Sequence, residues 1–344
     1  MTWNKKTLNN LFFIIGVVAV VVMLFTFDVS FVELWEHICH AGWWLVPIIG
    51  IWIVVYGLNA LAWRTVIKAN TDADEHVCML RIFRLTITGY ALNYATPVGG
   101  LGGEPYRIME LSRDISKEHA TSSVILYAMM HFFAHFWLWF SSIFLYLILV
   151  LIGDLTITVS IAIMLGLIVA LCLLAFYVFS KGYRNGVVVK IMTWLTKVPG
   201  LRNWSRKFIE KHDETLHNID KQIAALFLQD KKAFYESLFL EYSSRIVQSL
   251  EIMFMLLLFG VDCGGGASGL FLTFLHSILI LSLTTLFANL IGFLPMQLGV
   301  QEGGFVLSIA ILGLSPALGI FVSIICRVRE ILWIFIGILL MRLK

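Results

Sequence analysis

The chain has 344 residues, of which 59% are hydrophobic and 14% are charged. Soluble domains carry about 25% charged residues, so this composition argues against the two soluble domains that the length would otherwise suggest and predicts a polytopic membrane protein. The net charge of +3 is small, and its distribution is more informative than its total. The five cysteines are scattered and odd in number, with neither a disulfide framework nor a zinc spacing.

We expect an all-α protein with about six full spans, in a single integral membrane domain over residues 1–344. A span needs about 20 apolar residues. The N-terminal apolar run is too long for a signal-peptide core and has no small-residue cleavage site, so we expect it to remain as the first helix. The predicted spans are residues 11–27, 43–63, 120–152, 155–180, 236–260 and 317–341. A short surface helix is expected between the first two, with one apolar face made by Phe31, Leu34, Trp35 and Ile38.

Lys and Arg alternate between the loops and thereby predict the orientation. Residues 28–42 and the loops around Asp154 and Cys263 contain no Lys or Arg, whereas residues 181–235 carry eleven basic and five acidic residues. Both termini and the 181–235 loop are therefore expected in the cytoplasm, with the protein in the inner (cytoplasmic) membrane.

The 181–235 loop carries an apolar stripe at helical spacing, made by Phe208, His212, Leu216, Ile219, Ile223 and Leu226. It predicts a cytoplasmic amphipathic helix. The orientation rule alone requires no more than a helix packed beneath the bundle. The alternative is an element that binds anionic lipid headgroups.

Two regions do not read as simple spans. The first covers residues 82–114, and its second arm is too short to cross about 30 Å of hydrocarbon. The second covers residues 268–313, in which the arm after the break, 303–313, is again too short, while the first arm is long for half a hairpin. The basic-residue count places both ends of each region on one side, so each is predicted to be a re-entrant helical hairpin.

The breaks of the two hairpins resemble each other. "PVGGLGGE" runs from Pro97 to Glu104 and "PMQLGVQE" from Pro295 to Glu302, so each break places a Glu seven residues after a Pro. Glycines surround both glutamates, and a short helix is expected after each.

The flanking spans have opposite orientation in the two halves. Residues 43–152 form the first predicted repeat, with hairpin 82–114, and residues 236–341 form the second, with hairpin 268–313. This pattern is typical of an inverted repeat, which in transporters places the substrate site near the membrane midplane between the repeats.

The first break is suited to binding an anion. Non-helical backbone at membrane depth is tolerated only inside protein or beside a watery cavity, and Gly102 and Gly103 allow close backbone approach. Pro105 fits the first helical position, where free N–H groups attract anions. Arg107 is predicted to add a bidentate phosphate contact. The competing interpretation is that Glu104 caps its own helix and pairs with Arg107.

Charged residues inside the predicted spans indicate a polar pathway, because such residues usually face a bundle interior or cavity. Glu241 and Arg245 are spaced to pair at i, i+4. Structural locking explains one such pair, whereas a stripe over three turns favours a pathway. The predicted pathway residues are Asn93, His131, His135, Glu241, Arg245, Gln248, Glu251 and Asn289.

The last span adds Arg327, which shares a helix face with Glu330, whereas Arg329 points elsewhere. Arg327 is expected either to contact a headgroup or to pair with Glu302. With Gly102, Gly103, Glu104 and Arg107, these two residues complete the predicted substrate site. His131 and His135 share a face and could carry protons, although a histidine in an ordinary helix contact is the more common case.

The segments "TPVGGLGGEPYRIMELSRD", "LPMQLGVQEGGF" and "CRVREILW" together resemble the transmembrane region of the lysylphosphatidylglycerol synthetase family, the flippase-like domain of the multiple peptide resistance factor type. The resemblance covers nearly the whole chain, and its most specific part is the core of Gly103, Glu104 and Arg107. The second break departs from the family pattern at Gln297 and Val300. The resemblance implies movement of lipids between leaflets. It does not imply lipid aminoacylation, which belongs to a soluble C-terminal domain that we do not expect after Lys344.

The sequence is compatible with three classes of function. The sequence favours a flippase-like transporter of a phospholipid or lipid-linked anionic headgroup. The alternative is a membrane scaffold or accessory subunit for a lipid- or glycan-modifying enzyme. An intramembrane enzyme is disfavoured, because His276 lies eight residues, about 12 Å along one helix, from Ser268 of the "GASG" serine motif.

We therefore expect no enzymatic activity, no cofactor and no metal. The expected partners are membrane lipids with anionic headgroups and no nucleic acid, and a homo-oligomer is compatible with the sequence.

Overall fold

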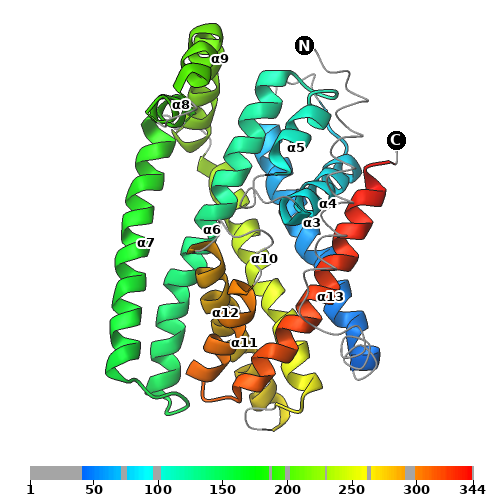
Figure 1. The fold of residues 1–344 in the computed structure, drawn as a ribbon, viewed down its shortest axis with the longest axis vertical. Helices are drawn as coiled ribbons and strands as arrows, with labels where there is room; N and C mark the ends of the chain where they lie inside the picture. Colours follow the sequence, from blue (N-terminus) through cyan, green and yellow to red (C-terminus); the bar gives the residue numbers. More distant parts are fainter. Residues whose placement is uncertain are drawn as a thin grey trace.

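The computed structural model describes residues 41–70, 76–95, 102–185, 188–197, 202–228, 231–261, 265–290 and 299–342. Within these ranges every regular element is a helix (Figure 1). The predicted first span 11–27 and the surface helix after it lie outside the described residues, as do Pro97 and Pro295, the prolines of the two predicted breaks.

In chain order the described elements are η1 (Gly42–Trp44), α3 (Leu45–Asn70), α4 (Met79–Ala95), α5 (Glu104–Leu111), α6 (Lys117–Leu151), α7 (Val159–Asn185), α8 (Val188–Leu195), α9 (Arg202–Leu228), α10 (Lys231–Leu258), α11 (Gly266–Leu290), α12 (Val300–Ile311) and α13 (Pro316–Leu340).

Four of the described helical stretches are long and apolar enough to cross a membrane: Gly42–Ala69, Lys117–Leu151, Val159–Lys181 and Gly266–Leu290. The first three match the spans predicted at 43–63, 120–152 and 155–180. The fourth is α11, which the sequence assigned to the first arm of a hairpin. Its 25 residues extend about 37 Å at 1.5 Å per residue, which by length alone is enough to cross the hydrocarbon core.

The other two predicted spans that the structure describes, 236–260 and 317–341, form the continuous helices α10 and α13. Neither is among the four apolar candidates, because each carries several charged residues in its middle. Those charged side chains are buried inside the protein, which is where a membrane helix can hold them.

Several contacts between helices in one half of the chain have a counterpart in the other half. Helices α3 and α10 pack along each other at the centre of the bundle. Helix α4 packs on α13, the last helix of the other half, and α11 packs in the corresponding way on α6. Each short helix, α5 or α12, contacts the two helices next to it in its own half.

Figure 1 shows which elements lie at each end of the molecule. Helices α5, α8 and α9 and the C-terminal end of α13 lie at the upper end, and the turn between α6 and α7 lies at the lower end. The pair α4–α5 occupies the upper half and the pair α11–α12 the lower half. The segments that the basic-residue count placed on one side of the membrane thus gather at one end.

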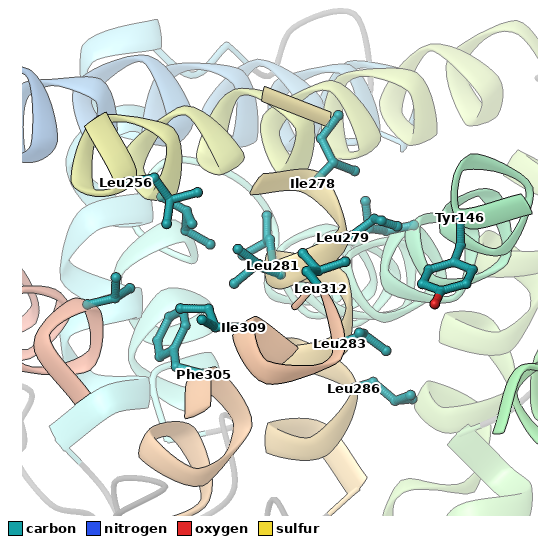
Figure 2. Packing of buried hydrophobic residues seen from close by; sticks show 14 of the residues in the cluster. Tyr146, Leu256, Ile278, Leu279, Leu281, Leu283, Leu286, Phe305, Ile309 and Leu312 are labelled. Atoms are coloured by element: carbon teal, nitrogen blue, oxygen red, sulfur yellow. The ribbon is translucent and has the colours of Figure 1, made fainter. Parts of the chain in front are cut away.

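Helix α11 lies in the hydrophobic core. Figure 2 shows its Leu279, Leu281 and Leu283 facing Phe305 and Ile309 of α12 on one side and Tyr146 of α6 on another. A helix that is apolar around its whole circumference is stable only when protein or lipid surrounds it. In the most apolar 18-residue stretch of α11, 61% is buried in the protein. This core fixes α12, and with it Glu302, against α13.

The basic 181–235 region folds into α8 and α9, followed by the start of α10. Helix α9 packs against α3, α6, α7 and α10, with Leu216 and Ile219 buried. Of the predicted apolar stripe, the structure also describes the half-buried Phe208. These contacts agree with the interpretation of a helix packed against the end of the bundle.

Candidate functional site

Arg107 of α5 lies in an enclosed cluster between α3, α4 and α6. Its side chain is 1% exposed, and Nη1 donates to Glu104 Oε1 at 2.8 Å. Nη2 donates to the Thr86 carbonyl at 3.2 Å. The guanidinium lies over the rings of Trp63, Tyr90 and Tyr127, with distances of 4.8 to 5.6 Å to their centroids. Arg107 therefore pairs with Glu104, as the competing interpretation required, and in this structure it is not presented to a phosphate.

Two glycines allow this cluster to form. A Cβ on Gly89 would collide with the Arg107 guanidinium, and a Cβ on Gly103 would collide with the Gly89 carbonyl. Gly103 is also the N-cap of α5, and its N–H donates to Asn93 Oδ1 at 2.6 Å. Asn93 Nδ2 in turn donates to Glu104 Oε1 at 3.3 Å. In place of a capping bond from Glu104, Asn93 provides the acceptor for the Gly103 N–H at the start of the helix.

A second group, which we call the histidine junction, joins α3, α6 and α10. His131 Nδ1 lies 2.9 Å from Glu241 Oε2, and Arg245 Nη2 lies 2.7 Å from each ring nitrogen of His131. Asn59 Nδ2 donates to Glu241 Oε1 at 2.9 Å. The predicted pairing of Glu241 with Arg245 is confirmed at 3.6 Å, and Arg245 Nη1 also donates to Gln248 Oε1 at 3.3 Å.

A third group surrounds Arg329 of α13. Arg329 Nε donates to Glu251 Oε1 at 2.7 Å, and the guanidinium stacks 4.0 Å above the Trp52 ring. Trp52 Nε1 donates to the other oxygen of Glu251 at 2.8 Å. Arg329 also lies 3.7 Å from Glu330. The carboxylate of Glu251 is thereby held between α3 and α13.

Arg327 continues this group to the start of α12. Its Nε donates to Glu302 Oε1 and its Nη1 to Glu330 Oε2, both at 2.9 Å. The pairing predicted between Arg327 and Glu302 is therefore confirmed. Gln301 Nε2 donates to Glu330 Oε1 at 3.0 Å, so two adjacent residues of α12 contact charged side chains of α13.

A small cavity of about 70 Å³ lies between α4, α10, α11, α12 and α13. Its polar lining includes Gln248, Glu251, Gln301, Arg329 and Glu330, and Ile252, Leu281 and Phe305 supply apolar surface. Gln248 is hydrogen-bonded to Arg245, so the cavity directly adjoins the histidine junction.

The Arg107 cluster, the histidine junction and the group around Arg329 and Arg327 form one continuous series of contacts. We call this series the polar path. Tyr90 connects its first part, because its ring lies under Arg107 and its hydroxyl is 2.9 Å from His131 Nδ1. Gln248 connects the histidine junction to the cavity and to Glu251. The path runs from Glu104 at the start of α5 to Glu302 at the start of α12.

Other residues predicted for the pathway or the substrate site lie beside this path or outside it. His135 is buried, and its ring contacts His131 at 5.4 Å between centroids. Asn289 donates to the Thr285 carbonyl of its own helix at 2.7 Å, so it does not repeat the role of Asn93. Gly102 is a half-buried turn residue before α5. The glutamates Glu104 and Glu302 make no direct contact with each other; each pairs with an arginine of its own half.

Several residues of the polar path were absent from the sequence prediction: Trp52, Asn59, Tyr90, Gln301 and Arg329. Asn59 had a sequence signal, because it is a polar residue within an apolar span. Arg329 also had a sequence signal, as a charged residue within a span. Its partner Glu251 could not be predicted, because it lies 78 residues earlier in the chain. Trp52 and Tyr90 carry no such signal, since aromatic residues are ordinary in membrane helices.

His276 and Ser268, the two residues of the possible intramembrane enzyme site, are bonded to other residues. His276 Nε2 lies 2.6 Å from Asp154 Oδ2, and the exposed Ser268 donates to the Gly265 carbonyl at 3.4 Å. Among the described residues, no group of three or more His, Cys, Asp and Glu side chains is arranged to hold a metal ion.

Comparison with known proteins identifies the chain at the level of its family. No curated protein and no solved structure matches it. The family model described as "Lysylphosphatidylglycerol synthase TM region" matches residues 13–338, which is nearly the whole chain and includes every residue of the polar path. The chain is a multi-pass membrane protein and belongs to the lysylphosphatidylglycerol synthase TM region family.

Proposed function

We propose that the protein is a flippase-like transporter that moves a phospholipid, or another lipid with an anionic headgroup, between leaflets. The observation that carries this proposal is the polar path through the interior of the bundle. Charged residues are expensive within a membrane protein and usually mark a substrate or ion route. The family is consistent with a role in lipid modification or flipping.

The inverted repeat is part of this proposal. Three features support it: the exchangeable packing of α4 on α13 and α11 on α6, the opposite placement of the short helices, and a glutamate in the first turn of each. Helices α5 and α12 have 8 and 12 residues, about 12 and 18 Å, and neither can cross about 30 Å of hydrocarbon. Each is proposed to be the returning arm of a hairpin.

The sidedness is also a proposal. The basic segments gather at the end of the molecule that contains α5, α8 and α9. By the positive-inside rule this end faces the cytoplasm. The C-terminus lies there with the end of α13, and we place the protein in the inner membrane, with the N-terminus on the same side.

A headgroup would cross by exchanging partners with the arginines of the path, while its acyl chains stay in the bilayer. In this structure the guanidinium groups of Arg107 and Arg327 are bound to carboxylates. Binding of a phosphate to either arginine therefore requires that a carboxylate give way. Rocking of the two halves around the central pair α3–α10 would expose the path to one leaflet at a time.

The test is reconstitution of the purified protein alone into liposomes that contain a fluorescent phosphatidylglycerol. Chemical quenching from outside reports the fraction of labelled lipid in each leaflet. We expect exchange at least tenfold faster than in protein-free liposomes. Gln248→Leu, which keeps the size of the side chain but removes the link between Arg245 and the cavity, should reduce that rate strongly. Lys232→Ala is the matched control at the exposed start of the same helix.

The same measurement separates the transporter from a scaffold or accessory subunit. A transporter exchanges labelled lipid with no other protein present. A scaffold would leave the rate at the protein-free level for the wild type and for both variants, and this result would overturn the proposed function.

A further inference from the structure

We infer that a proton and an anionic headgroup bind this protein together, because a proton that binds the His131 ring releases Arg245 to bind the phosphate. This inference rests on the proposed function and adds to it the coupling ion and the residue that links ion to substrate. It comes from the bonding of the histidine junction and of the groups beside it.

The present contacts of His131 fit a neutral ring. Its Nδ1 lies 2.9 Å from the Glu241 carboxylate, which can only accept, so Nδ1 carries the hydrogen. Arg245 Nη2 lies 2.7 Å from the ring nitrogens and can only donate. One ring nitrogen must therefore accept from Arg245, and the only nitrogen left for this is Nε2.

A proton from water that binds Nε2 removes that acceptor. The ring then carries a positive charge and two N–H groups, and the guanidinium of Arg245 faces it at hydrogen-bond distance. The two adjacent cations then share the single carboxylate of Glu241 and repel each other inside the protein. Arg245 is therefore displaced from the ring, whereas Glu241 keeps its bond to Nδ1–H.

Arg245 has a second position available. Its Nη1 already donates to Gln248, which lines the cavity. Its Nε is buried without a hydrogen-bond partner, and the side chain is 7% exposed. A buried donor without an acceptor costs about 1–3 kcal/mol. A phosphate oxygen near Gln248 would satisfy Nε and pair with the freed guanidinium.

The charges along the polar path agree with a bound proton. Five carboxylates, Glu104, Glu241, Glu251, Glu302 and Glu330, accompany four guanidinium groups, Arg107, Arg245, Arg327 and Arg329. With neutral histidines the path carries one net negative charge, which one proton neutralises. An anionic headgroup adds a further negative charge, which makes proton binding more favourable still.

The groups that face His131 come from helices α4, α6 and α10. Helix α4 contributes Tyr90, helix α6 contributes Tyr127, Phe132 and His135, and helix α10 contributes Glu241 and Arg245. Arg107 of α5 adds a more distant positive charge. Glu241 is the only carboxylate among these described neighbours, and it favours the protonated ring. Arg245 is the cation that must move.

The first measurement uses the wild-type protein in detergent and the water-soluble probe glycerophosphoglycerol, a phosphodiester whose single charge is constant from pH 5 to pH 8. Binding is measured by calorimetry, and proton uptake is measured in weak buffer. We expect uptake of up to one proton per bound probe. Linkage then requires the dissociation constant to rise up to tenfold per pH unit above the pH at which His131 titrates.

Three variants locate the effect. His131→Gln should bind the probe with an affinity that does not change with pH, and Arg245→Gln should lose binding at every pH. His217→Gln is the matched control: this histidine also lies beside a carboxylate, Asp213, but on the exposed face of α9. It should retain the wild-type pH dependence. The wild-type proton uptake needs no variant, so a variant that fails to fold does not stop the test.

The outcomes are distinct from those for lipid exchange. Probe binding without proton uptake, a His131→Gln variant that keeps the pH dependence, or no probe binding by the wild type would overturn the inference. Lipid exchange by the wild type in any of these cases leaves the proposed function intact. Proton-linked probe binding without lipid exchange would support the inference and overturn the proposed transport function.

Discussion

The first turns of α5 and α12 contain the same residue in different surroundings. Glu104 pairs with Arg107 three residues later in its own helix, and both side chains are largely enclosed, at 14% and 1% exposed. Glu302 pairs with Arg327 from α13, and its side chain is 33% exposed. Three aromatic rings cover Arg107, whereas Arg327 has a second carboxylate, Glu330.

This difference shows that a repeated motif does not guarantee a repeated site. The first half binds its arginine within a closed aromatic enclosure. The second half shares its charges between two helices, beside a cavity and with more solvent access. For the proposed transporter, alternating access requires such an asymmetry between the two halves in any single state.

The largest expected effect is that of Arg107→Ala. Removing the fully buried Arg107 side chain leaves Glu104 without its cation and removes one donor to the Thr86 carbonyl. We expect a loss of about 3–5 kcal/mol in the free energy of unfolding, measured by chemical denaturation in detergent. Arg113→Ala is the control in the same region, because that side chain is 41% exposed and should cost at most about 1 kcal/mol. Equal losses for both variants would mean that the enclosure of Arg107 contributes nothing.

The next effect compares the glycines beside the two glutamates. Gly103→Ala forces a methyl group into the Gly89 carbonyl and should cost about 1–3 kcal/mol. Gly303→Ala, at the position after Glu302, meets nothing within 4 Å. Inside helix α12 it should stabilise the protein by about 0.5–1 kcal/mol. Thermal unfolding of the two variants should therefore shift in opposite directions, and a shift in the same direction would contradict the close contact of α4 with α5.

A smaller difference is expected for the two asparagines. Asn93→Ala removes the partner of the Gly103 N–H and a donor to Glu104, at a cost of about 1–2 kcal/mol. Among the described residues Asn289 donates to its own helix alone, so Asn289→Ala should change stability by less than about 0.5 kcal/mol. Denaturant midpoints measure both, and a larger effect at Asn289 would show that it has a role equivalent to Asn93.

The smallest expected effect is that of Glu302→Gln on stability. Arg327 keeps Glu330 after this change, and Glu302 is partly exposed, so the loss should be below about 1 kcal/mol. Glu104→Gln should cost more, because Glu104 supplies the one carboxylate bonded to Arg107 among the described residues. Thermal unfolding would rank the two variants, and the reverse ranking would remove the asymmetry between the halves.

Much of the architecture follows from the sequence. Three spans, the shortness of α5 and α12, the buried stripe on α10 and the pairs Glu241–Arg245 and Arg327–Glu302 were all predicted. These features depend on hydrophobic length and on spacing along one helix, which the order of residues determines. The alternation of basic loops likewise predicted which segments gather at one end.

Only the tertiary structure decided where the charged groups of different helices meet. Arg329 donates to Glu251 of α10, and Asn59 donates to Glu241 across the α3–α10 pair. Tyr90 contacts both Arg107 and His131. The tertiary structure also decided which helices bury the apolar surface of α11. Helical spacing specifies the neighbours within one helix but not the partner that packing brings from a distant one. The connection of single charges into a path is therefore a property of the folded bundle.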